Sequence, residues 1–253
     1  SRRRHTRYIS VTGVQTCALP ISIHVQAAET LARAAGVDIR ILDLSFSDLM
    51  KLDGLPQFDV ITAHGVWSWV SAENRALVVE LLKRHLVDGG IFFLNTVSMP
   101  AEAEIMPLQR LLRVQRASEP KSALDFANAL QQAGSPYFAP SSRAGRRLTA
   151  LRDATPRYIS HEYLNEHWHA CLFADTASAL GEAGLEFLAP MRLIDQIDAS
   201  HFTPAQCAFL ASIDDAALRE TARDFLRPGR QRYDAFVKGG TRSEEHTSEL
   251  QSH

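Results

Sequence analysis

One stretch constrains the fold more than any other: the apolar run at residues 58–63, which stops abruptly at His64 and Gly65. The run reads Phe-Asp-Val-Ile-Thr-Ala and is followed by Val-Trp-Ser-Trp-Val. An apolar segment of strand length that ends in a polar, glycine-containing turn before a helix is typical of α/β sheets, which present functional groups at the carboxyl ends of their strands. The sequence therefore predicts a buried strand with candidate functional residues directly after it.

The two ends of the chain differ in origin from the rest. Residues 242–253 read RSEEHTSELQSH and residues 11–22 read VTGVQTCALPIS. Both resemble translations of one short-read sequencing adapter, on opposite DNA strands, and residues 1–7 resemble a translated primer. We therefore treat 1–22 and 241–253 as adapter-derived and expect natural sequence over about 23–240. The resemblance of the N-terminal residues to a signal peptide is set aside for the same reason.

Composition limits the classes of function. The chain has a formal net charge of −2 and stays mildly acidic without its terminal segments, which argues against a nucleic-acid partner or an anionic membrane. Cys171 and Cys207 show no Cys-x-x-Cys or Cys/His spacing, so a reduced, cytoplasmic setting without zinc is expected. No apolar run approaches the ~20 residues of a membrane span, so no membrane insertion is expected.

Periodicity predicts the order of the elements. Helices are expected at 24–35, from Ser71 to 88–90, at 108–114, 123–132 and 174–183, after Thr203, and at 216–226. Strands are expected at 39–44, 91–95, 185–188 and 232–237, in addition to the run that begins at Phe58. The first part of this series is compatible with a parallel, doubly wound α/β sheet. Residues 101–156 carry few strand signals and favour an inserted helical cap.

A family resemblance adds to these predictions. The stretch 58–70, its helix and the sequence Asp-Gly-Gly-Ile-Phe-Phe-Leu at 88–94 resemble the second half of a class I S-adenosylmethionine-dependent methyltransferase. Together with Ala-His-Gly-Val-Trp-Ser-Trp-Val at 63–70, the run 158–168 and Phe-Ala-Asp at 173–175 are similar to methyltransferases that carry a methyltransferase regulatory domain. Some members of that group methylate lysines of bacterial outer-membrane proteins.

The resemblance implies a particular organisation. Residues 23–100 would be the C-terminal half of the catalytic domain, 101–156 a helical insertion, and 157–240 a regulatory-domain-like region that returns to the sheet. The fold class is then α/β: a partial Rossmann-like sheet without strands 1 and 2, joined to a mainly helical regulatory region. The acceptor implied is a protein lysine, with S-adenosyl-L-methionine as cofactor. The oligomeric state is left open.

Two features of the family lie outside the natural sequence. Its members bind the cofactor over a glycine-rich turn after strand 1 and hold the ribose with an acidic residue after strand 2. We therefore expect a complete parent to bind S-adenosylmethionine and this chain, as written, to be inactive and to bind it weakly. The alternative is a non-catalytic protein-binding or regulatory module on a degenerate methyltransferase scaffold.

The resemblance also assigns candidate cofactor residues. Ser45 and Phe46 end strand 3, where the family places the adenine; the alternative is an ordinary strand-end turn with the ring in the core. Ala63, His64 and Gly65 would lie against the cofactor, and the glycine suits a backbone that comes close to it. His64 is the candidate catalytic residue because a lysine amine must lose its proton before it attacks. It could instead bond a backbone carbonyl of the turn.

The candidate substrate residues come from three segments. Trp67 and Trp69 could line a substrate channel, although their alternation predicts that one of them packs in the core. The remaining candidates implied by the resemblance are Asn95, Tyr163, Asn165 and Trp168. A metal is not expected at the His-rich run, because His-Glu-Tyr-Leu-Asn at 161–165 lacks the second histidine of a zincin motif.

Overall fold

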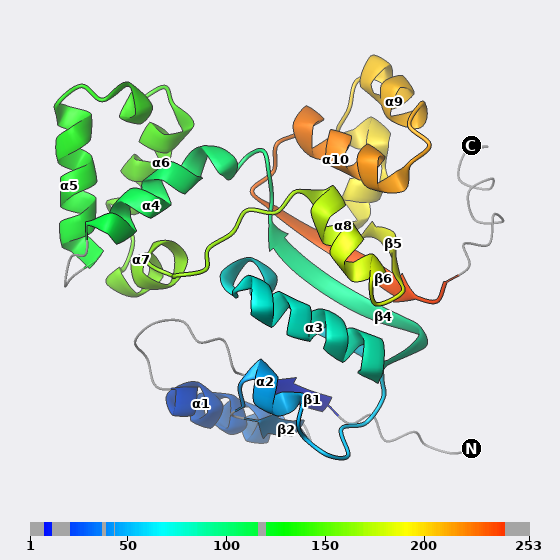
Figure 1. Cartoon of the computed structure of the whole chain (residues 1–253). Coiled ribbons are helices and arrows are strands. Elements are labelled where there is room, and N and C mark those ends of the chain that lie inside the picture. The colour runs from blue at the N-terminus through cyan, green and yellow to red at the C-terminus, as the bar shows by residue number, and fades with distance from the viewer. Residues whose placement is uncertain (1–7, 12–20, 37–38, 43, 116–119, 241–253) are drawn as a thin grey trace.

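The computed structural model describes residues 8–11, 21–36, 39–42, 44–115 and 120–240 (Figure 1). The segments attributed to adapter are 1–22 and 241–253. Of these, residues 1–7, 12–20 and 241–253 lie outside the described residues. Within these ranges the strands form two separate sheets, one of two strands and one of four.

The four-stranded sheet has the order β3 (Phe58–Ala63), β4 (Leu86–Val97), β6 (Gln231–Lys238) and β5 (Leu185–Pro190). β3 and β4 are parallel, whereas β6 runs antiparallel to both β4 and β5. The sequence predicted these strands, and the parallel arrangement expected of the first part of the series is found between β3 and β4. The direction of β6 was not predicted. Alternating hydrophobicity marks a strand and one of its faces, and it carries no information on direction.

The two-stranded sheet stands apart. β1 (Tyr8–Val11) pairs in parallel with β2 (Ile39–Leu42), and α1 (Ile21–Ala34) connects them. Because β2 belongs to this small sheet, β3 pairs with β4 alone among the described strands, and its other edge is free. Val60 on this edge strand is 57% exposed, which is unusual for a valine within a sheet.

The core of the large sheet lies on one face. α3 (Ala72–His85) and α8 (Phe173–Gly181) lie over the same side of β4 and β6 (Figure 1). Leu82, Phe92, Leu180 and Phe236 are fully buried in the cluster between them. Burial of this apolar surface is the main force that holds the helices to the sheet.

α3 begins as the sequence predicts and ends earlier. The Ser71 hydroxyl accepts a hydrogen bond from the backbone N–H of Asn74, which caps the first turn. The helix ends at His85 and β4 follows at once, so the Gly89-Gly90 pair bends the first part of the strand and does not terminate the helix. Gly89 adopts a φ of 75°, a conformation that favours glycine.

Residues 103–163 form a helical unit with a core of its own. Its elements are η2 (Ala103–Ile105), α4 (Met106–Val114), α5 (Pro120–Gln132), η3 (Pro136–Phe138), α6 (Arg143–Leu151) and α7 (Pro156–Tyr163). Leu108, Leu112, Leu148 and Leu151 are among its buried residues. Two of these helices, α4 and α5, match the predicted pieces, whereas α6 and α7 were not predicted as helices.

The last part of the chain leads back to the sheet. After β5 come η4 (Leu193–Gln196), η5 (Asp198–Ser200), α9 (Pro204–Ala211) and α10 (Ala216–Leu226). Thr203 and Gln206 form a reciprocal capping box at α9, and Asp215 caps α10. The predicted helix at 216–226 is confirmed at both ends. Among the described residues, no helix combines the length and apolar character needed to cross a bilayer.

Candidate active site at the carboxyl end of β3

The predicted strand end is found where β3 stops. Ala63 is buried at the last position of the strand, and His64 and Gly65 follow it on the exposed side. Gly65 has a φ of 67°, and a Cβ added there would meet no atom within 4 Å. Its conformation, not crowding, therefore calls for glycine in this structure.

Register places three side chains in one row across the sheet. Ala63 pairs with Leu94, so His64 follows beside Asn95, and Asn95 pairs directly with Tyr233 of β6. The rings of His64 and Tyr233 have their centroids 6.0 Å apart and are inclined by 37°. Asn95 is 2% exposed, and its amide Nδ2 donates to the backbone oxygen of Arg232 at 2.9 Å. The sequence prediction missed Tyr233, because only the pairing of β4 with β6 brings it to this row.

Both tryptophans after the strand are buried. They lie in a 3₁₀ turn, η1 (Trp67–Trp69), and not in an extended segment with alternating faces. Trp67 joins the main core, whereas Trp69 packs with Val97 and Ala170 in a smaller cluster against which Trp168 also packs. Strand-like alternation, which would leave one of them facing a cleft, does not describe this geometry, since a 3₁₀ turn has a different period.

Ser68, between the two tryptophans, connects three segments. Its hydroxyl accepts a hydrogen bond from the backbone N–H of Val97 at 2.8 Å, and its carbonyl accepts one from the N–H of His169 at 2.8 Å. Ser68 is 0% exposed. The turn after β3 is thereby fixed to the end of β4 and to the run at 168–171. The sequence signal was a single hydroxyl residue between two large apolar ones, and it was not recognised.

Tyr163 belongs to the core of the helical unit. It is 2% exposed, and its hydroxyl accepts a hydrogen bond from Nη1 of Arg147 at 2.9 Å. Arg147 also donates to both carboxylate oxygens of the buried Glu102, at 2.6 and 3.0 Å. Burial raises the pKa of Tyr163, and the neighbouring arginine partly offsets that effect. These contacts give the side chain a structural role and do not connect it to His64.

Asn165 is held by the same unit. Its carbonyl accepts from the Gln109 amide at 3.0 Å, and its side-chain oxygen accepts from the N–H of His167 at 3.0 Å. Its Nδ2 is buried and has no hydrogen-bond partner among the described residues. The roles predicted for Tyr163, Asn165 and Trp168 at a substrate stay predictions.

The two residues predicted to contact adenine lie at the start of α2 (Phe46–Leu49). The Ser45 hydroxyl caps this helix, accepts from the backbone N–H of Asp48 at 3.1 Å and donates to its carboxylate at 2.6 Å. This hydrogen bond, followed by the effect of Lys51, lowers the pKa of Asp48. Phe46 packs against the main core. The hydroxyl and ring thus have partners within the chain, and their role toward a cofactor stays a prediction.

The His-rich run was considered as a metal site in the sequence. Within the described residues no three or more His, Cys, Asp or Glu side chains are grouped so that they could hold a metal ion. The side chain of His161 lies outside the described part. Burial, and to a smaller extent Arg75, lowers the pKa of His169. Burial raises the pKa of the Cys171 thiol, which marks it as an inert core residue.

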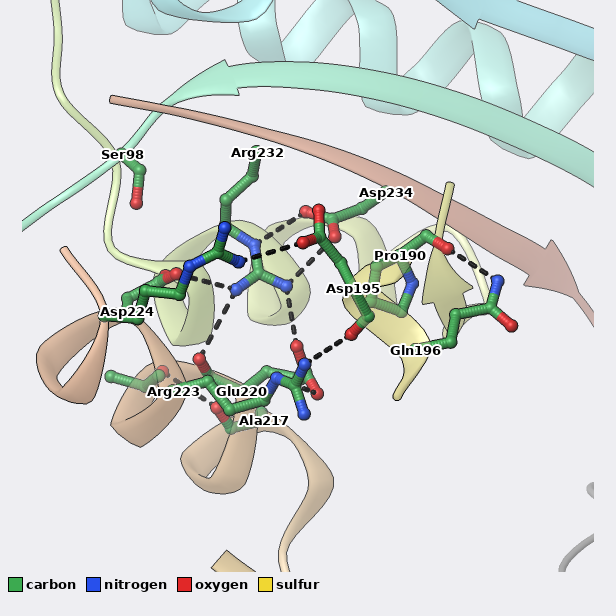
Figure 2. A network of polar contacts seen from close by, with 12 residues as sticks. Ser98, Pro190, Asp195, Gln196, Ala217, Glu220, Arg223, Asp224, Arg232 and Asp234 are labelled. Atoms are coloured by element: carbon green, nitrogen blue, oxygen red, sulfur yellow. Dashed lines mark hydrogen bonds and ion pairs between the residues drawn. The ribbon is translucent and has the colours of Figure 1, made fainter. Parts of the chain in front are cut away.

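A buried ion network supports β6 from the covered face of the sheet (Figure 2). Arg232 donates to the carboxylates of Asp234, Glu220 and Asp224 at distances of 2.8 to 3.0 Å. Its guanidinium also lies 4.3 Å from the centroid of the Phe173 ring. Burial on its own would lower the pKa of Arg232, but the carboxylates, Asp234 foremost, raise it overall. The network joins β6 to α10 and fixes the strand that carries Tyr233.

Comparison with solved structures defines the class of the fold. PKMT2 from Rickettsia typhi superimposes with a TM-score of 0.68 at 19% identity, over 92% of this chain and 48% of that one. The structure of PKMT2 in complex with AdoHcy gives a TM-score of 0.69 at 20% identity, over 93% and 49%. The chain has the fold of the class I methyltransferases, with β3, β4, β6 and β5 in its larger sheet.

Sequence comparison gives the more particular assignment. Residues 155–238 match the family described as "Predicted methyltransferase regulatory domain". An uncharacterized protein of Synechocystis is 35% identical over 224 residues, which are 85% of this chain and 44% of that protein. One from Rickettsia prowazekii is 28% identical over 148 residues, 54% and 57% of the two chains. Residues 155–238 thus resemble a methyltransferase regulatory domain, in a chain with a class I methyltransferase fold that spans about half the length of these relatives.

Proposed function

We propose that this chain is the acceptor-side half of an S-adenosylmethionine-dependent methyltransferase that N-methylates lysine side chains of proteins. The observation that carries the proposal is the position of His64: it follows the end of β3, in a class I sheet, in the row with Asn95 and Tyr233. A titratable, exposed imidazole at the carboxyl edge of such a sheet is suited to proton transfer. The likeness to PKMT2 and the regulatory domain support it.

The described residues fit only part of an S-adenosylmethionine site. The turn at Ala63–Gly65 has an open approach, since a Cβ at Gly65 would meet nothing within 4 Å. The free edge of β3 is where further strands of a class I sheet would pair. The backbone amides and the acidic group that hold the methionine and ribose parts would come from a segment that pairs with this edge. A longer parent protein is therefore required for tight binding.

The chemistry assigned to this chain is acid–base and positional. When bound, S-adenosylmethionine supplies an electrophilic methyl group on a positively charged sulfur. A lysine amine attacks only as the neutral form, so one proton must leave the nitrogen for each methyl gained. His64 can accept that proton, because its ring is exposed and within the described residues forms no hydrogen bond. Orientation of the amine by the surrounding rings would supply much of the remaining rate gain.

The test uses the longer protein, labelled S-adenosylmethionine and outer-membrane proteins as acceptors, with modified lysines located by mass spectrometry. His64→Asn is expected to reduce kcat by about 10²- to 10⁴-fold, the usual contribution of a general base. His85→Asn is the matched control, because His85 ends α3 next to Leu86, which pairs with the first residue of β3 and not its last, and bonds the Pro56 carbonyl. Equal activity of both variants, or no lysine methylation by the wild type, would contradict the proposal.

One observation favours the alternative of a non-catalytic binding module. The segment after β5 exposes a run of large apolar side chains: Met191, Leu193, Ile194 and Ile197 are 47 to 77% exposed. Apolar side chains gathered in this way often mark an interaction surface. The sequence upstream of this chain in the parent gene separates the two functions. A glycine-rich turn and a ribose-binding acid favour catalysis, and their absence favours a scaffold.

A further inference from the structure

Tyr233 occupies a constrained position in the sheet. Its neighbours along β6, Arg232 and Asp234, both turn into the buried ion network (Figure 2). Successive side chains of a strand point to opposite faces, so Tyr233 lies on the other face, on the side of His64. Its hydroxyl donates to the side-chain oxygen of Gln231 at 2.8 Å. The ring is therefore held at both its backbone and its hydroxyl.

One face of that ring already carries a cation. The guanidinium carbon of Arg192 lies 4.5 Å from the ring centroid, the geometry of a cation–π contact. Arg192 is exposed, and no hydrogen bond or ion pair holds its guanidinium within the described part of the chain. The aromatic ring is thus its partner there.

The segment that carries Arg192 is anchored at one point and open beyond it. The N–H of Met191 donates to the carbonyl of Tyr233 at 2.8 Å, which fixes the start of the segment beside the ring. Leu193, the next residue after Arg192, is 77% exposed. The arginine side chain can therefore leave the ring without breaking a backbone hydrogen bond or exposing a core residue.

We infer that the face of Tyr233 is a binding seat for the cationic side chain of the acceptor, an alkylammonium group such as that of lysine or methylated lysine. The Arg192 side chain occupies this seat until the acceptor displaces it. This inference rests on the proposed function and names how that site recognises its substrate. The seat lies beside His64, whose ring centroid is 6.0 Å from that of Tyr233, so a cation held there is close to a proton acceptor. An exposed cation–π contact is weak, which makes exchange of one cation for another inexpensive.

The seat can be tested by NMR on the full chain without cofactor. The probes are Nα-acetyl-lysine methylamide, its Nε-trimethyl form and the uncharged norleucine analogue. Both cations are expected to shift the ring signals of Tyr233 and His64 saturably, and norleucine is not. Arg192→Gln removes the guanidinium that covers the ring and should tighten cation binding about two- to fivefold, the range of an exposed cation–π contact. Tyr233→Phe keeps the ring and should retain binding, whereas Tyr233→Leu should abolish it.

The control variants test whether the Tyr233 ring itself holds the cation. Arg227→Gln removes another exposed arginine, one that pairs with Asp195, and should leave the probe affinity unchanged. Cation binding that survives Tyr233→Leu, or an unchanged affinity in Arg192→Gln, would overturn the inference, as would the absence of binding. The failure of this inference and the failure of the proposed function can be told apart. If the chain binds the probes in this way but the parent does not methylate lysine, the seat is supported and the proposed function is contradicted. If the parent methylates lysine with a KM that Tyr233→Leu does not change, the proposed function is supported and the seat is contradicted.

Discussion

Arg232 and Asp234 lie two residues apart on β6 and are joined side by side: Nε donates to one carboxylate oxygen at 2.8 Å and Nη2 to the other at 3.0 Å. Both side chains are at least nine-tenths buried, and Glu220 and Asp224 share the same guanidinium. One arginine thus neutralises part of the charge of three buried carboxylates. The strand that carries Tyr233 depends on it.

Loss of this arginine should therefore be severe. Arg232→Met is expected to lower the free energy of unfolding by about 3–5 kcal/mol, because it leaves buried carboxylates without their counter-charge. Arg227→Met, at an arginine that is 53% exposed and paired with Asp195, should cost about 1 kcal/mol or less. Urea unfolding measures both. A similar midpoint for the two variants would show that the network does not hold β6.

Asp224 makes the same network sensitive to pH. Burial raises the pKa of this carboxyl to about 6, although Arg232 works in the opposite direction. Because the pKa in the folded state lies above that of the unfolded chain, the contribution of Asp224 to stability is fully present below the unfolded pKa. It is lost as the pH rises through the folded pKa. Asp224 should therefore stabilise the fold more at pH 5 than at pH 7.5.

The measurement compares the wild type with Asp224→Asn at both pH values. The difference in unfolding free energy between the two proteins should change in favour of the wild type on acidification, by about 1 kcal/mol. Asp215→Asn, at the exposed cap of α10, serves as the control without a buried charge. A wild-type advantage that is constant or falls toward pH 5 would contradict the raised pKa.

The helices and strands that the sequence predicted share a local signal. Asp215 before an apolar stripe predicted the helix at 216–226, and the structure confirms both its ends. α6 was missed because its apolar positions, which include Leu148, are interleaved with Gly145 and a group of arginines. Its place as a helix depends on packing against the core of the helical unit.

The candidate site was predictable at the ends of β3 and β4, where His64 and Asn95 lie, and not at β6. The position of His64 follows from local sequence, since it ends an apolar run, and the resemblance gave it a role. Tyr233 and Ser68 were not predicted, because their relation to His64 and Val97 arises from strand register and from a buried hydrogen bond between distant segments. A single sequence shows neither the pairing of strands nor the partner of a hydroxyl group.

A variant of Tyr163 distinguishes a structural role of its hydroxyl from a role in substrate binding. Tyr163→Phe removes the hydroxyl that accepts from Arg147 and should cost about 2 kcal/mol of stability, the range of a buried hydrogen bond to a charged group. The same change at Tyr158, also on α7 but 38% exposed, should cost much less. Thermal unfolding measures both, and an unchanged KM for the acceptor would leave Tyr163 with a structural role alone. A raised KM with unaltered stability in Tyr163→Phe would place this residue at the substrate after all.

Gly145 lies in a helix of the helical unit and Gly181 in a helix outside it, and together they give a matched pair of variants that tests the packing of the unit. Gly145 in α6 lies against the Ala139 and Phe138 carbonyls, and a Cβ built there would overlap backbone atoms that cannot move cheaply. Gly181 ends α8 with nothing within 4 Å of its Cβ position. Gly145→Ala should therefore lower the free energy of unfolding by about 2 kcal/mol or more through overpacking. Gly181→Ala should raise it by about 0.5 kcal/mol through the better helix propensity of alanine. Urea unfolding resolves the opposite signs, and a neutral or stabilising Gly145→Ala would mean that the contact of α6 with the 138–139 turn is looser than the structure shows.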